Sequence, residues 1–271
     1  MSKEALPDIK NIKSQETFTL PSKGLFYTEE DKIPASITLR RMTTKEDKMR
    51  LRNQSEFTIR RDILQECIMN EGVDAGKLKL IDANFLLFRL RTISLLTDQY
   101  KVHCKCPLCG AEFINELNLS DIPIQYMDKK KLDLFSVVLP VESEKATKKQ
   151  GREVKFIVNL KLPTLDETIK AIDDFAEYRK AFPDVDVSDY LYTTTNLQYI
   201  KDIGGNRLMK EELANLIDTL DIVDSRKLMS QIDKLQNIYG FEDEIIAQCP
   251  ACHQDVIHGL PITSELFTPS N

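Results

Sequence analysis

Two pairs of cysteines with the same two-residue spacer limit the fold of this chain more than any other feature. Cys106–Cys109 has the sequence Cys-Pro-Leu-Cys, and Cys249–Cys252 has the sequence Cys-Pro-Ala-Cys. Such a spacer lets one tight turn direct both sulfurs at one metal ion, and four thiolates suit tetrahedral Zn²⁺. Four thiolates also leave no open coordination position, so the zinc we expect is structural. Its four ligands would be Cys106, Cys109, Cys249 and Cys252.

Other uses of these thiols stay open. A Cys-x-x-Cys pair also occurs as a redox dithiol. Three side chains beside the pairs offer replacements for one thiolate, namely His103, Cys104 and His253. The sixth cysteine, Cys67, lies on the apolar face of a predicted helix, so we expect it to act as a small buried hydrophobe.

The two cysteine pairs lie unusually far apart for one metal site. Residues 110–248 separate them, whereas an ordinary zinc ribbon places tens of residues between its pairs. Each pair is preceded and followed by a strand-like segment. We therefore expect a zinc-ribbon-like module made of residues 101–125 plus 241–262. Residues 126–240 would be an insertion whose ends the metal brings together.

The chain before this module divides into a polar segment and a folded region. Residues 1–19 show little periodicity, so we expect a flexible arm at the N-terminus. Residues 20–100 form a predicted α+β domain, in which Ile37 and Leu39 alternate as in a strand. Thr43 and Glu46 have the spacing of a capping box, which predicts a helix start. Two more helices are expected, one ending near Gly72 and one starting at Asp82.

The insertion combines a predicted hairpin with a run of helices. The hairpin strands would be Leu134–Val141 and Val154–Leu162, joined by a mobile surface loop over Glu142–Glu153. Thr164 and Glu167 form a second capping box, and Ser188–Ile203 is a predicted helix closed by two glycines. Apolar stripes over residues 213–220 and 228–238 predict two more helices. The predicted fold class is α+β, mainly helical, with a zinc-ribbon-like β element and a β-hairpin plus helical insertion.

Composition and missing motifs exclude several classes of protein. Hydrophobic residues make up 42% and charged residues 30%, which is compatible with a folded core, and the formal charge is −6. The negative charge makes nucleic-acid binding an unfavoured function. No apolar run reaches the ~18 residues that a membrane span needs, so we expect a cytosolic protein whose cysteines bind metal. Phosphate-binding glycine loops and the serine nucleophile elbow are absent from the sequence, so we expect neither an enzyme nor a small-molecule substrate.

An ordered set of segments in residues 1–125 resembles a known family. The segments are Phe18–Gly24, Met42–Asp47, Ile63–Ile68, Asp82–Ser94 and the first cysteine pair. Their order and spacing resemble the baseplate hub assembly family of T4-like contractile-tailed bacteriophages. The resemblance implies a non-enzymatic role in building the tail baseplate, as a virion component or as an assembly factor in the host cytoplasm. It implies other tail proteins as partners, such as the hub or the tape measure, and it supplies no catalytic residues.

Two other functions remain as alternatives at this point. A zinc ribbon is also found in nucleic-acid-binding or transcription adaptor proteins, although here the basic residues lie outside the predicted ribbon. A zinc or thiol enzyme is the third hypothesis. A separate question concerns Leu20–Tyr27, an apolar Pro-Gly segment whose side chains either cap the protein's own core or dock on a neighbouring tail protein.

Overall fold

The computed structural model describes residues 14–181, 183, 194–242, 244–260, 262 and 264–267. It has an α+β fold, as predicted, with helices packed beside small sheets. The helices are α1 (Thr44–Met49), α2 (Glu56–Cys67), α3 (Leu80–Leu95), α4 (Pro140–Gln150), α5 (Leu165–Ala181), α7 (Lys210–Thr219) and α8 (Ile222–Gln236). The short 3₁₀ helices are η2 (Glu29–Asp31), η3 (Ala75–Lys77), η4 (Lys129–Phe135) and η5 (Ser264–Phe267).

All strand pairs of the described residues are antiparallel. The strands are β1 (Gln15–Thr19), β2 (Ser36–Arg40), β3 (Gln99–Lys105), β4 (Glu112–Asn118), β5 (Ile124–Gln125), β6 (Ser136–Leu139), β7 (Phe156–Leu160), β8 (Ile200–Ile203), β9 (Gly240–Phe241), β10 (Ile245–Gln248) and β11 (Asp255–His258). Strands β6, β7 and β8 form one sheet, and the others form the ribbons β1–β2, β3–β4, β5–β9 and β10–β11.

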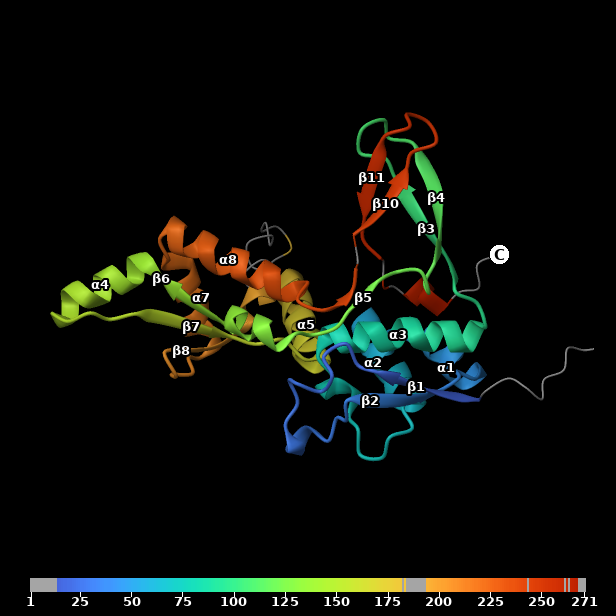
Figure 1. Ribbon diagram of the computed structural model, residues 1–271, viewed down its shortest axis with the longest axis horizontal. Helices are drawn as coiled ribbons and strands as arrows, with labels where there is room; N and C mark the ends of the chain where they lie inside the picture. The colour runs from blue at the N-terminus through green and yellow to red at the C-terminus, as the bar shows by residue number, and fades with distance from the viewer. Residues whose placement is uncertain are drawn as a thin grey trace, which may run out of the picture.

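These elements form three parts that are visible in Figure 1. The body (residues 14–98) holds α1, α2, α3 and the β1–β2 ribbon. The lobe (residues 126–239) extends to one side with β6, β7, β8, α4, α7 and α8. The arm (residues 99–118 and 244–258) projects away from both and consists of the β3–β4 and β10–β11 hairpins.

The body is built around α3, which is apolar on nearly all sides and therefore buried. Its neighbours include α2, α5, β1, β9 and η5. Phe18 of β1 packs against the same core, and β1 pairs with β2 from Gln15↔Arg40 to Thr19↔Ser36. The prediction of a flexible N-terminal arm over residues 1–19 is therefore wrong for Gln15–Thr19, because this stretch has a partner strand and an apolar contact. Residues 1–13 lie outside the described residues.

Both predicted capping boxes are confirmed. The Thr43 N–H donates to the Glu46 carboxylate at 2.7 Å, and Thr43 Oγ1 accepts from the Lys45 N–H at 3.2 Å. At the start of α5, the Thr164 N–H donates to the Glu167 carboxylate at 2.9 Å, and the Glu167 N–H donates back to Thr164 Oγ1 at 3.2 Å. Each box satisfies backbone donors that the helix itself cannot pair.

Two predicted helix boundaries in the body are wrong. Helix α2 ends at Cys67 rather than at Gly72, because Ile68 is extended and bridges Leu39 of β2. Helix α3 begins at Leu80 rather than at Asp82, since Lys79 is extended and bridges Thr164. In both cases a contact with a distant segment sets the helix end, and local sequence signals do not record such contacts.

The predicted hairpin of the lobe is confirmed, but its connection is not a mobile loop. Strands β6 and β7 pair from Ser136↔Asn159 to Leu139↔Phe156. The segment between them is α4, with Pro140 in its first turn and Gly151 as a left-handed cap. Lysine, glutamate, glutamine and alanine are good helix formers, and Glu144 pairs with Lys148 one turn later at 2.6 Å. The polarity of this segment predicts a loop, but its helix-forming residues determine the structure.

The predicted helix over Ser188–Ile203 is wrong at its end. Ile200–Ile203 is β8, the third strand of the lobe sheet, and among the described residues just before it the helical ones are 194–197. Residues 188–193 lie outside the described residues. A short apolar run has no periodicity that distinguishes a strand from a helix. Here the run becomes a strand because it pairs with the free edge of β7. The two later stripes form α7 and α8, as predicted.

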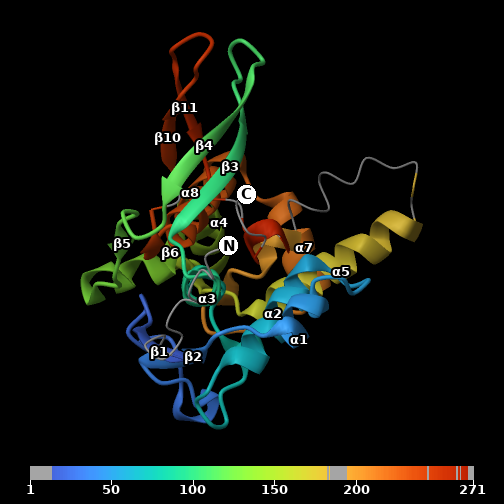
Figure 2. The same ribbon diagram turned by 90° about the vertical axis from the view of Figure 1, so that its right-hand side faces the viewer.

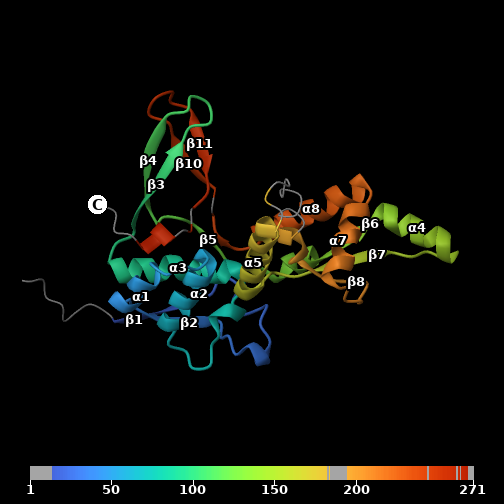
Figure 3. The ribbon, with the colours of Figure 1, turned by 180° about the vertical axis from the view of Figure 1, so that it is seen from behind.

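One short ribbon and a packed junction connect the lobe to the rest of the protein. Strands β5 and β9 pair through Ile124↔Phe241 and Gln125↔Gly240, so the two ends of the insertion lie side by side. Phe26 packs between the two parts, with ring centroids 5.1 Å from Phe135 and 5.8 Å from Tyr239. Of the apolar side chains in Leu20–Tyr27, those of Leu20, Phe26 and Tyr27 thus pack on the protein's own core, whereas Leu25 is exposed. Helix α5 also contacts the body, as Figure 3 shows from behind.

A buried carboxylate holds this junction together. Asp82 is fully buried and accepts from the Ser22 N–H at 3.1 Å and from the Tyr27 hydroxyl at 2.6 Å. The Tyr239 hydroxyl donates to the same carboxylate at 3.4 Å from the end of the lobe. Burial raises the pKa of Asp82, and these hydrogen bonds act against the rise. Asp82 thereby ties three segments that are distant in sequence.

Within the described residues, none of the helices combines the length and the apolar composition that crossing a bilayer requires.

Candidate metal centre

The four cysteines of the two Cys-x-x-Cys pairs lie at the far end of the arm. Cys106 and Cys109 are in the turn between β3 and β4, and Cys249 and Cys252 are in the turn between β10 and β11. Figure 2 shows the two hairpins side by side with both turns at the tip. The predicted strand–turn–strand units on either side of the insertion are therefore confirmed, and the fold brings them together.

The two turns have the same backbone hydrogen bonds. In the first, the Gly110 N–H donates to the Cys106 carbonyl and the Cys106 N–H donates to the Ala111 carbonyl, both at 2.9 Å. In the second, the His253 N–H donates to the Cys249 carbonyl and the Cys249 N–H donates to the Gln254 carbonyl, again at 2.9 Å. This repeated geometry explains why the spacer has two residues in both pairs.

The residue after each pair has a left-handed backbone. Gly110 has φ +75° and His253 has φ +57°. Glycine adopts this conformation without steric cost, whereas histidine does so at some cost. His253 therefore contributes to the second turn through its backbone, and its side chain is exposed.

The sulfur positions fit one tetrahedral metal ion. All four Sγ atoms lie within 4.8 Å of one another. The Sγ atoms of Cys106 and Cys252 are 3.7 Å apart, and those of Cys109 and Cys249 are also 3.7 Å apart. A tetrahedral Zn²⁺ with sulfur at ~2.3 Å puts its ligands about 3.8 Å from one another. The two distances join opposite turns, so a bound ion would link the two hairpins.

Backbone donors favour the thiolate form of one cysteine in each turn. The Cys109 N–H, followed by that of Leu108, lowers the pKa of Cys106 to about 7. The Cys252 and Ala251 N–H groups lower the pKa of Cys249 in the same way. The Gln254 N–H lowers the pKa of Cys252, but burial and the neighbouring thiols outweigh it and raise that pKa to about 12. Four thiolates repel one another at this separation, so a divalent cation is needed to keep all four deprotonated.

The other ligands considered from the sequence stay outside the cluster. Cys104 is buried on the inner face of β3, where its thiol lies 3.7 Å from the Val102 carbonyl. His103 is exposed on the opposite face of the same strand, and Cys67 is fully buried in the body. Burial raises the pKa of Cys67 to about 12, in line with the predicted inert role.

The contacts that join the hairpins below the cysteines were not predicted. Asn115 Nδ2 of β4 and His258 Nε2 of β11 lie 2.9 Å apart. Val256 packs with the buried Cys106 and Cys249, and Phe113 packs against this group. The alternation of apolar residues in β4 and β11 could have indicated an inner face, whereas the pairing of Asn115 with His258 depends on the tertiary fold.

Comparison with known proteins finds a protein family that covers most of the chain. The model of a protein family described as T4 bacteriophage base plate protein matches residues 13–268. No curated protein and no solved structure matches the chain. The match includes the arm, the body and the lobe, and it extends well past the 125 residues that carried the resemblance in the sequence. The chain therefore belongs to the family of T4 bacteriophage base plate proteins.

Proposed function

We propose that this protein is a non-enzymatic component or assembly factor of the baseplate hub in a contractile phage tail. The observation that carries the proposal is the family match over residues 13–268. The chain acts within the tail baseplate of the virion, or in the host cytoplasm while tails assemble. Its partners are other tail proteins, such as the hub or the tape measure.

The proposal assigns the arm a structural Zn²⁺ held by Cys106, Cys109, Cys249 and Cys252. The 3.7 Å separations between sulfurs of opposite turns support a shared ion, as does the convergence of four thiols. With four protein ligands the ion has no position for a substrate, so its effect is to join the hairpins. Because the hairpins flank the insertion, the ion also closes the long loop between them.

A nucleic-acid adaptor is the less favoured function. Residues 241–262, which include the whole second hairpin, contain no lysine or arginine. Phosphate contacts need such side chains, and they supply most non-specific affinity for nucleic acids. In β3 the half-buried Lys101 lies 3.5 Å from Glu116 of β4, which compensates its charge in part.

The experiment that tests the baseplate role uses a phage carrying this gene with an early stop codon. In a non-suppressing host we expect lysates without complete baseplates, and full-length protein supplied in trans should restore them. Electron microscopy of tails and mass spectrometry of purified virions provide the readouts. Normal tails and normal infectivity without the protein would contradict the proposed function.

A further inference from the structure

One face of the arm exposes an isoleucine pair. Ile246 of β10 and Ile257 of β11 are directly opposite cross-strand partners. Their side chains are 66% and 65% exposed. The inner face of the same hairpin carries the buried Ala247 and Val256. An antiparallel ribbon with one packed face normally turns polar residues to the other, so this pair is unusual for a surface that only meets water.

Two acidic residues lie near the pair. Asp255 lies two residues before Ile257 in β11, on the same face of the hairpin, and Glu244 lies immediately before β10, two residues from Ile246; both are exposed. The chain supplies no lysine or arginine between residues 241 and 262. The opposite hairpin differs, because there an exposed Ile114 lies among side chains of both signs, including the Lys101–Glu116 ion pair.

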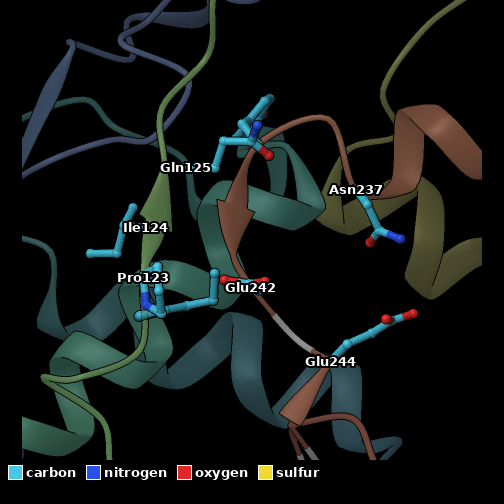
Figure 4. A pocket seen from close by; sticks show the side chains of 8 residues that line it. Pro123, Ile124, Gln125, Asn237, Glu242 and Glu244 are labelled. Atoms are coloured by element: carbon cyan, nitrogen blue, oxygen red, sulfur yellow. The ribbon is translucent and has the colours of Figure 1, made fainter. Parts of the chain in front are cut away.

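The acidic surface continues into a hollow at the foot of β10. This cavity of about 620 Å³ has Tyr239 and Phe241 among its apolar lining, with Glu242 and Glu244 on its polar side. Figure 4 shows the Glu244 and Asn237 side chains directed into the space between the end of α8 and the start of β10. An apolar lining beside carboxylates and amides suits the aliphatic stem and charged head of a lysine or arginine.

The negative charge of this face determines which kind of partner can bind to it. A second copy docked on the same face about a two-fold axis would bring two copies of the same acidic surface together, which is unfavourable. Nucleic acid and anionic lipid are disfavoured by the same sign of charge. A protein surface with aliphatic side chains next to lysine or arginine matches both the isoleucine pair and its acidic surroundings.

We propose that the outer face of β10–β11, with the hollow at its foot, is the docking surface for a basic, partly aliphatic patch on another tail protein. The inference rests on the proposed baseplate role, since that role supplies the class of partner. Aliphatic side chains of the partner cover Ile246 and Ile257, and its cationic side chains approach Glu242, Glu244 and Asp255. The metal-linked turn at the end of the hairpin holds this face in shape before binding, which lowers the ordering cost of association.

Site-specific photo-cross-linking during infection tests the proposal on the full-length protein. A benzophenone amino acid replaces Ile257 in one variant and Ile114 in the matched control, which is exposed on the opposite hairpin. We expect the probe at 257 to capture one tail protein, through a peptide that carries lysine or arginine next to aliphatic residues. Capture at 114 should be about tenfold weaker or more. Equal capture at both positions, capture of a second copy, an acidic captured peptide, or no capture at 257 would overturn the proposal.

Charge reversal provides a second measurement on the same surface. The double variant Glu244→Lys/Asp255→Lys should reduce cross-linking from position 257 by about tenfold or more, while its zinc content and melting temperature stay as in the wild type. Unchanged cross-linking in this folded variant would contradict the proposal. If the stop-codon phage fails to build baseplates but these variants assemble normally, the docking surface is wrong and the baseplate role stands. If the stop-codon phage assembles normally, the baseplate role itself is wrong.

Discussion

Gly110 and His253 occupy equivalent positions in the two cysteine turns. The effect of a side chain on this left-handed backbone conformation can therefore be compared within one protein. A Cβ at Gly110 would meet nothing within 4 Å, and only the φ of +75° opposes a side chain there. We expect Gly110→Ala to lower the free energy of unfolding by about 1 kcal/mol and His253→Gly to raise it by roughly 0.5 kcal/mol. Urea unfolding of both variants checks this, and an equal loss in both would show that the histidine side chain has a role of its own.

Glu46 is the residue whose charge should matter most for stability at acid pH. It is fully buried, and the Arg40 guanidinium, together with donors from Thr43, lowers its pKa from 4.5 to about 2. A lowered folded-state pKa means that this stabilisation is fully present above pH 4.5 and is lost as the pH falls towards about 2.

The matching variant is Glu46→Gln. At pH 7 we expect it to be less stable than the wild type by roughly 2 kcal/mol, and this difference should shrink steadily between pH 4.5 and pH 2. Denaturant unfolding across this range measures the difference. Glu66→Gln is the control, because Glu66 pairs with Lys45 on the surface, where an ion pair contributes little. A constant difference at all pH values would show that the carboxylate charge is not the cause.

At the scale of elements, the local signals of this sequence predict structure well where neighbouring residues suffice. Both capping boxes and both cysteine turns form as expected, because each depends on contacts within a few residues. Apart from α4, whose helix formers are a local signal, the features that were not predicted share one cause. Strand β8 forms on the free edge of β7, α2 ends where Ile68 meets β2, and the β5–β9 ribbon joins Ile124 to Phe241 across the insertion. These contacts are non-local, so no window of the sequence contains them.

In the candidate metal site, too, local features could be predicted from the sequence and non-local contacts could not. The four cysteines could be named from their spacing, and their convergence followed from the chemistry that thiolates share. The contact between Asn115 and His258 and the junction around Asp82 could not be named. A single aspartate or histidine gives no periodic signal, and its partners come from elements that only the fold brings close.

The junction between body and lobe gives the prediction at this scale. Phe26 is partly buried against Phe135 and Tyr239. Because it is only partly buried, we expect Phe26→Ala to cost about 2–3 kcal/mol, below the ~3–5 kcal/mol of a fully buried phenylalanine, with a melting temperature several degrees lower. The neighbouring Leu25→Ala is the control, since Leu25 is 39% exposed. Wild-type melting of Phe26→Ala, or an equal effect of both variants, would show that Phe26 does not hold the junction.

At the scale of the whole molecule, several contacts among the described residues close the chain around the lobe, and two of them join its flanking segments directly. One is the β5–β9 ribbon together with the Asp82 junction, and the other is the cluster of four cysteines at the tip of the arm. The ribbon has only two residue pairs, whereas a bound Zn²⁺ adds a strong link between hairpins that are far apart in sequence. We therefore expect the arm, and with it the docking surface on β10–β11, to depend on the bound metal.

Metal analysis of the purified full-length protein tests this central claim most directly. The account predicts about one equivalent of zinc per chain, with loss of the zinc and a lower melting temperature in the double variant Cys249→Ser/Cys252→Ser. Cys104→Ala is the matched control and should keep its zinc, because Cys104 lies on the inner face of β3, outside the cluster. Full zinc content in the double variant, or a wild-type protein that binds no zinc, would contradict the claim that these four cysteines share one structural ion.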